Sequence, residues 1–185
     1  MTQINDVNPW GTHRKTGAGE KARVFMRTTT QTLILGIGNS LLSDDGVGVH
    51  IVRALETNIQ IIHLVALRDG GTIGLELLAA VEQFNSLIAI DAMELDDAPG
   101  AMQVFQGLDM DKQLRGSKRT AHEVALSDLI SAAHLAGTVP QRRALIAIQP
   151  GSTDWGLAPT KAVGAAIPKA CKAVASILES WNDER

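Results

Sequence analysis

Short apolar runs alternate with amphipathic stretches from residue 32 onward. Runs bounded by turn residues predict strands at 32–37, 59–67, 86–92, 101–107 and 143–150, the first of them buried. Stretches with apolar residues at steps of three and four predict helices at 46–57, 73–84, around 126–133, and 158–182. The 101–107 strand follows a Pro-Gly turn and is expected at an antiparallel edge. Residues 108–121 read as a polar loop, and Pro168 is expected to kink or restart the last helix.

Strands that alternate with helices predict an α/β fold, with a largely parallel sheet covered on both faces. We interpret residues 32–185 as a single domain with a core of its own. Residues 1–31 are polar, rich in Gly and Thr, and without periodicity, so they are expected to form a flexible N-terminal extension.

Charge and composition narrow the range of partners. A formal net charge of −3 gives no sign of a nucleic-acid partner. No apolar run approaches the roughly 18 residues that a membrane span needs. The single cysteine, Cys171, cannot form an internal disulfide, which favours a reducing, cytoplasmic setting. Cys171 lies in the apolar stripe of the last predicted helix and is expected to be a packed core residue.

The turn after the first strand resembles a dinucleotide-binding motif but departs from it. Its third glycine is replaced by Leu41, and Asp44 and Asp45 stand where the helix begins. A phosphate there would meet two carboxylates, each repelling it by about 1–4 kcal/mol. The turn therefore favours a cation or acid–base chemistry. Structural alternatives remain, because Asp44 is a typical helix N-cap and Asp45 a typical first-turn acid.

Two more acids and a histidine are expected at the same edge of the sheet. Asp91 closes the 86–92 strand, Asp69 follows the 59–67 strand, and His122 precedes a helix. Sites in such sheets form outside the carboxyl ends of the strands. Asp91 needs a partner or a cleft, whereas Asp69 before two glycines is also a typical turn residue and His122 also a typical cap. Carboxylates and an imidazole together suit a divalent borderline metal.

Other hydrolytic chemistries lack their motifs. The "HEVAL" segment has no second histidine in the zinc-protease position, and the chain has no G-x-S-x-G nucleophile motif. A single cysteine cannot provide a paired-cysteine zinc site.

Several segments together resemble the maturation endopeptidases of nickel–iron hydrogenases. They are "GIGNSLLSDDGVGVHIVRAL", "RDGGTIGLELL", "LIAIDAMELDDAPG", "TAHEVALSDLISAAHLAGTVPQRRALIAIQP" and "GLAPTKAV", in order between residues 32 and 180. Single motifs such as G-x-G-N are weak signals, but the ordered set is specific. The resemblance implies a three-layer α/β/α sandwich around a mainly parallel, five-stranded sheet.

The same resemblance implies a function and a site. Family members remove a C-terminal peptide from the large subunit precursor of a hydrogenase after nickel insertion. Position by position, Asp45, Asp91 and His122 would be both the metal-binding and the catalytic residues. The nickel would be carried by the substrate and recognised rather than stably bound. Several family members have Glu at the first place, so Asp45 keeps the charge but reaches about 1.5 Å less far.

Two mechanisms are open for the cleavage step. The metal polarises the carbonyl or a water, or Asp45 or Asp91 acts as general base; we favour a water activated between metal and carboxylate. Asp69, Gly70, Gly71 and Thr72 are candidates for binding the precursor's tail through main-chain groups. We expect a cytoplasmic monomer with no nucleic-acid or membrane partner. Two other functions remain open: a non-catalytic nickel-sensing assembly factor, and a nucleotide- or cofactor-binding α/β protein.

Overall fold

The computed structural model describes residues 32–57, 65–72, 77–116 and 121–183, without the side chains of 121–123. The predicted N-terminal extension lies outside the described residues, as do parts of the predicted 59–67 strand and 73–84 helix. None of the helices in the described part of the chain is long and apolar enough to cross a membrane.

Five strands form one mixed sheet in the order β2-β1-β3-β5-β4. They are β1 (Thr32–Ile37), β2 (Val65–Gly71), β3 (Ser86–Ala92), β4 (Met102–Gln106) and β5 (Arg142–Ile148). All neighbouring pairs are parallel except β4 and β5. The mainly parallel, five-stranded sheet with one antiparallel edge strand is therefore confirmed.

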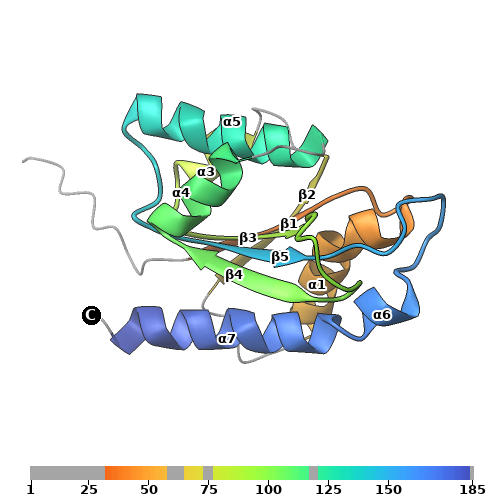
Figure 1. Ribbon diagram of the computed structural model, residues 1–185. Coiled ribbons are helices and arrows are strands. Elements are labelled where there is room, and N and C mark those ends of the chain that lie inside the picture. Colours follow the sequence, from red (N-terminus) through yellow and green to blue (C-terminus); the bar gives the residue numbers. More distant parts are fainter. Residues whose placement is uncertain (1–31, 58–64, 73–76, 117–120, 184–185) are drawn as a thin grey trace, which may run out of the picture.

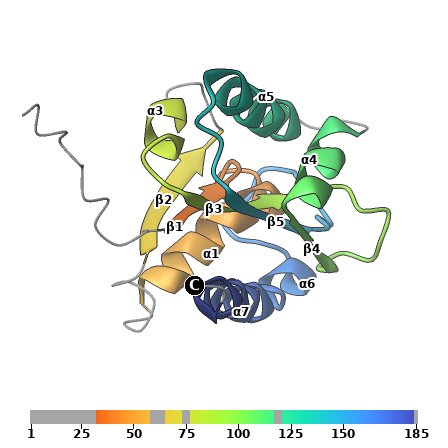
Figure 2. The ribbon, with the colours of Figure 1, turned by 90° about the vertical axis from the view of Figure 1, so that its left-hand side faces the viewer.

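Helices cover both faces of the sheet (Figures 1 and 2). One layer holds α1 (Val47–Glu56), α6 (Lys161–Gly164) and α7 (Ile167–Asp183), and the other holds α3 (Leu78–Val81), α4 (Leu108–Arg115) and α5 (Ala121–Ala136). A short 3-10 turn, η1 (Ser43–Gly46), precedes α1. The three-layer α/β/α sandwich expected from the sequence is confirmed.

Alternate residues of the central strands feed two separate cores. In β3, Ile88 and Ile90 face α1 and α7, while Leu87 and Ala89 face α3, α4 and α5. Successive side chains of a strand point to opposite faces, so strands covered on both sides must be apolar throughout. This is why β1 and β3 were readable as continuous apolar runs.

Several predicted boundaries were wrong. The expected loop at 108–121 contains α4, in which Met110 and Leu114, four residues apart, are buried on one face. The strand expected to end at residue 67 continues to Gly71, through residues expected to form a turn. In the region expected to form a helix at 73–84, α3 spans only Leu78–Val81 of the described residues.

The C-terminal segment forms two helices rather than one. The second, α7, begins at Ile167, so Pro168 lies in its first turn, where a backbone N–H has no helical acceptor in any case. The expected restart at this proline is confirmed.

Gly48 determines how closely α1 lies against the sheet. A Cβ at this position would lie 2.2 Å from the carbonyl oxygen of Ile90 and 2.5 Å from that of Ile37. Both contacts are with backbone, which cannot rotate away. Gly48→Ala is therefore expected to lower the free energy of unfolding by about 3 kcal/mol, measured by urea denaturation.

Gly164 in α6 supplies the matched control for Gly48. A Cβ at Gly164 would meet nothing within 4 Å. Gly164→Ala should change stability by less than about 1 kcal/mol. Equal stability of the two variants would show that α1 does not need this close approach.

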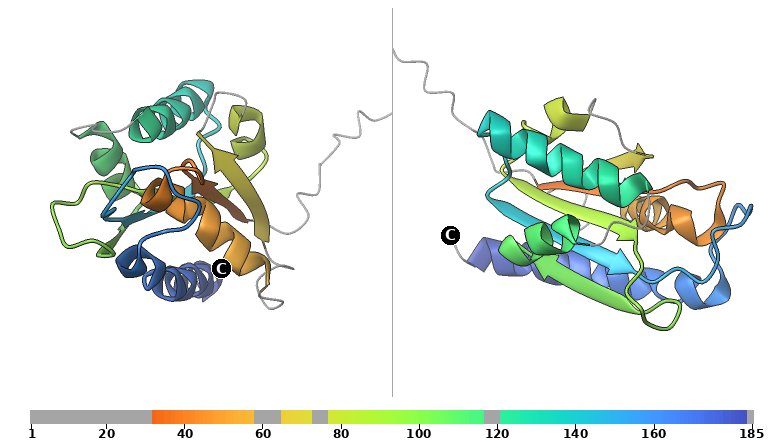
Figure 3. Two further views of the ribbon diagram at one scale, coloured as in Figure 1. Left: turned by 90° about the vertical axis from the view of Figure 1, so that its right-hand side faces the viewer. Right: turned by 45° about the horizontal axis from the view of Figure 1, so that its top comes forward.

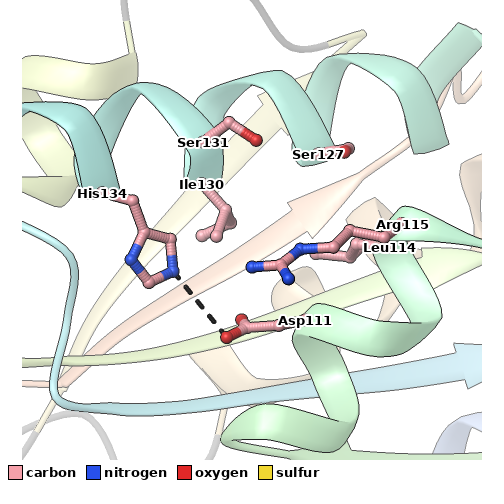
Figure 4. Close-up of a pocket in the computed structure, with 7 residues that line it drawn as sticks. All are labelled: Asp111, Leu114, Arg115, Ser127, Ile130, Ser131 and His134. Atoms are coloured by element: carbon pink, nitrogen blue, oxygen red, sulfur yellow. Dashed lines mark ion pairs between the residues drawn. The ribbon is translucent and has the colours of Figure 1, made fainter.

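A buried ion pair fixes α4 at the end of the sheet where β5 starts. Arg143, the second residue of β5, donates from Nε to Asp111 of α4 at 2.8 Å, and both side chains are less than one tenth exposed. His134 of α5 lies 3.7 Å from the same carboxylate. Figure 4 shows His134 and Asp111 at a small cavity between α4 and α5, with a volume of about 20 Å³, enough for one water molecule.

The ion pair gives stability a defined pH dependence. The hydrogen bond from Arg143 holds the pKa of Asp111 below its ordinary value of 3.8. The stabilisation is therefore present above that value and is lost as the pH falls from it toward the lowered pKa. Asp111→Asn leaves Arg143 buried without its counter-charge and should cost about 3 kcal/mol or more at pH 7.

The free energy of unfolding, measured as a function of pH, tests this prediction. The stability difference between wild type and Asp111→Asn should shrink below pH 4, whereas exposed Asp109→Asn should differ little from wild type at any pH. A difference that stays constant down to pH 2 would contradict this account.

Candidate active site

A tight turn places Asp45 at the carboxyl end of β1. Gly38 has a φ of +123°, and a Cβ there would lie 1.8 Å from the carbonyl oxygen of Asp45, so this turn requires glycine. The Asp45 side chain is 7% exposed, and its Oδ2 accepts a hydrogen bond from the Asn39 N–H at 2.8 Å. The acid is thus held at the sheet edge, almost out of solvent.

This arrangement does not favour a nucleotide. A phosphate-binding loop presents free backbone N–H groups to its anion. Here the Asn39 N–H is donated to Asp45, and the neighbouring Asp44 is fully buried. The turn therefore presents carboxylates where a phosphate would need donors.

Asp44 holds two distant parts of the chain together. Its carboxylate accepts hydrogen bonds from the backbone N–H groups of Gly151 (2.8 Å), Ser152 (3.0 Å) and Thr160 (2.6 Å). The Thr160 hydroxyl donates a fourth at 2.9 Å. The N-cap role considered for Asp44 was wrong, since η1 and α1 have no side-chain cap. Asp44 instead closes the 151–160 segment against the turn that carries Asp45.

Asp91 lies next to this turn on the central strand. It is fully buried and is the last residue but one of β3. By strand alternation it follows Leu87 and Ala89 on the face covered by α5. The segment η1 contacts β3, and Gly48 of α1 lies against Ile90. The structure therefore brings the segments of Asp45 and Asp91 together.

The backbone of His122 lies in the first turn of α5, at the same edge. Residues 137–141 connect the end of α5 to the start of β5, so the two run in opposite directions (Figure 1). Sixteen helical residues span about 24 Å, and the seven of β5 span about 23 Å. The helix therefore begins near the level where β5 ends.

The three proposed metal ligands cannot all be located, because the structure does not describe the side chain of His122. Among the side chains that are described, no group of three metal-ligating residues is found. The His122 side chain is outside that set, so the triad with Asp45 and Asp91 stays a prediction.

The Asp-Gly-Gly-Thr segment forms the end of edge strand β2 and the turn after it. Asp69 is exposed; its Oδ1 accepts from the Gly71 N–H at 2.9 Å, and its Oδ2 lies 3.5 Å from Arg53. The Gly71 carbonyl accepts from the Gly38 N–H at 2.8 Å, which joins this segment to the Asp45 turn. Asp69 lies within β2 and not in a turn, although its side chain bonds to the N–H two residues on, and substrate binding by Asp69, Gly70, Gly71 and Thr72 stays a prediction.

Cys171 lies in α7, on the face of the sheet opposite α5. It packs against the apolar core, and burial raises the pKa of its thiol. Its expected role as a packed core residue is therefore supported.

Sequence reasoning missed the partners of Asp44, because Gly151, Ser152 and Thr160 lie more than 100 residues away. The "PGS" turn after β5 marks a loop but does not show which acid it binds.

Comparison with known proteins places this architecture in a family. The model of the hydrogenase maturation protease family matches residues 49–177. A hydrogenase expression/formation protein of Rhizobium leguminosarum is 36% identical over 151 residues, covering 81% of this chain and 75% of the relative. The hydrogenase 2 maturation protease of Escherichia coli is 35% identical over 153 residues, covering 82% and 93%.

A solved structure agrees with both. The hydrogenase maturating endopeptidase HybD of E. coli superposes with a TM-score of 0.72 at 33% identity, covering 81% of this chain and 93% of that one. The chain therefore belongs to the hydrogenase maturation protease family, and it is a peptidase.

Proposed function

We propose that this peptidase removes a C-terminal peptide from the large subunit precursor of a nickel–iron hydrogenase, once the precursor holds nickel. Family membership supports the kind of substrate. The observation that carries the proposal is that η1, with Asp45, contacts β3, whose end carries Asp91, at one edge of the sheet. The start of α5, with His122, is inferred to lie near the same edge, because α5 and β5 run in opposite directions over similar lengths.

The donor set suits a metal that arrives with the substrate. Two carboxylates and an imidazole offer oxygen and nitrogen ligands, and the single thiol, Cys171, lies in α7 and packs against the apolar core. A site without thiolates binds nickel modestly, so it would complete the coordination of nickel in the precursor without withdrawing it. Nickel is thus part of the substrate.

The candidate residues have different roles in cleavage. Asp45, Asp91 and His122 contact the nickel, and one of the two carboxylates also accepts a proton from the attacking water. Asp45 is 7% exposed and Asp91 is 0% exposed, so the fold shields both residues from bulk solvent. The end of β2 and the residue after it, Asp69, Gly70, Gly71 and Thr72, then bind the extended tail of the precursor, with the Gly71 main chain, which is bonded to Asp69 and Gly38, holding the segment in place.

One gel tests the function. Purified precursor, nickel-loaded and nickel-free, is incubated with the protein and analysed for length. We expect shortening of the loaded precursor alone. Shortening without nickel would contradict nickel recognition, and unchanged length in both would favour a non-catalytic assembly factor. A rise in melting temperature with nucleotide but not with nickel-loaded precursor would favour a cofactor-binding protein.

We also propose that the protein is cytoplasmic and that it is a monomer. The next measurement addresses the monomer. Sedimentation of the purified chain would test it, and a stable dimer would contradict it.

A further inference from the structure

Three large apolar side chains are exposed beside the candidate active site. Trp155 is 83% exposed, Leu157 76% and Leu41 47%; we call these three residues the rim patch. They lie on two loops, after β1 and after β5, at the carboxyl edge of the sheet. Figure 3, left, views the molecule from this end, where the two loops run in front of the sheet.

The two loops are held together by backbone hydrogen bonds. The Gly156 N–H donates to the Leu41 carbonyl at 2.9 Å, and the Ser43 N–H donates to the Gly156 carbonyl at 2.8 Å. Gly156 stands between Trp155 and Leu157, so this pairing brings all three apolar residues to neighbouring positions. The Asp44 carboxylate fixes the same loop at Gly151 and Thr160. The patch is therefore displayed on a well-bonded support.

The same support carries Asp45. The Asp45 N–H donates to the Leu42 carbonyl at 3.0 Å, so the residue next to Leu41 is bonded directly to the candidate catalytic residue. A protein chain whose backbone reaches Asp45 brings the rest of that protein against this edge. The patch and Asp45 thus lie on the same pair of bonded loops.

We infer that the rim patch docks the folded body of the hydrogenase large subunit precursor, through an apolar surface on that protein; this rests on the proposed function. The size of the patch argues against a second copy of this chain. Three side chains offer a few hundred Å² at most, whereas a stable dimer buries about 800 Å² per partner. A small apolar anchor centred on a tryptophan fits a transient complex whose remaining contacts lie in the cleavage site.

The experiment combines binding with kinetics. Trp155→Ser and Leu157→Ser are compared with wild type for the KM and kcat of precursor processing, and, in an Asp91→Asn background, for affinity to nickel-loaded precursor. Leu135→Ser is the matched control, since Leu135 is 92% exposed at the far end of α5. The patch variants should raise KM and weaken affinity by about 10-fold or more with kcat unchanged, and the control should match wild type.

Each result decides. Unaltered KM and affinity in the patch variants would overturn the docking role while leaving the proposed function standing. A fall in kcat at constant KM would overturn it as well, since docking acts on binding. Patch-dependent binding without any cleavage by wild type would contradict the proposed function but support docking. A melting temperature equal to that of wild type shows that a variant is folded. Substitutions at these exposed positions are not expected to cause misfolding.

Discussion

Asp91→Asn is expected to slow processing of nickel-loaded precursor by about a thousandfold. The substitution keeps the size of a fully buried side chain but removes the charge that a nickel ion or a water proton needs. Asp45→Asn and His122→Ala should lower the rate to a similar extent, because the three residues act on the same bond and the same ion. Quantified gels at saturating precursor give the rates.

Two controls separate this site from general damage. His134→Ala removes an imidazole from the same helix, α5, but at its other end, and Asp109→Asn neutralises an exposed acid of α4. Both should retain processing within about threefold of wild type. Wild-type rates in Asp91→Asn, or an equal loss in His134→Ala, would contradict the assignment of the site.

Asp44→Ala is expected to lower the free energy of unfolding by about 3–5 kcal/mol. The fully buried carboxylate accepts three backbone N–H groups and one hydroxyl, and the substitution leaves all four donors without it. The 151–160 segment would then detach from the Asp45 turn, so processing should fall too. Chemical denaturation followed by circular dichroism measures the stability change.

Asp154→Ala provides the comparison within the same loop. Asp154 is exposed and accepts from the Ser152 hydroxyl at 3.0 Å, so its loss should cost less than about 1 kcal/mol. If the two variants were equally stable, Asp44 would not hold the loop in solution.

The sequence predicted those parts of the fold that depend on local pattern. The strands β1 and β3 are apolar on both faces and bounded by polar residues, which allowed them to be located to the residue. Helix α4 was missed because few apolar residues, chiefly Met110 and Leu114, carry its buried face. Sparse apolar positions among charged residues do not distinguish a short helix from a loop, and packing against β5 decides the outcome.

The sequence predicted which segments lie near the candidate site, but not the hydrogen bonds that their side chains make. Parallel strands must bring their carboxyl ends to one edge, so residues that follow β1 and β3 were expected near each other. The roles within the Asp44-Asp45 pair could not be separated by spacing, because the hydrogen-bond partners of Asp44 come from beyond β5. Leu41 stands in place of the third motif glycine, which normally allows a helix to pack closely on its strand, and Gly48 supplies the close approach of α1 instead.

Contact of Asp45, Asp91 and His122 with the nickel of the precursor is the central proposal. Nickel-edge X-ray absorption of loaded precursor, alone and frozen in complex with this protein before cleavage, tests it directly. The account predicts that oxygen and nitrogen ligands are added to the nickel in the wild-type complex, and that the His122→Ala complex lacks the nitrogen contribution. A nickel environment unchanged by wild-type protein, in samples that go on to be processed, would contradict it.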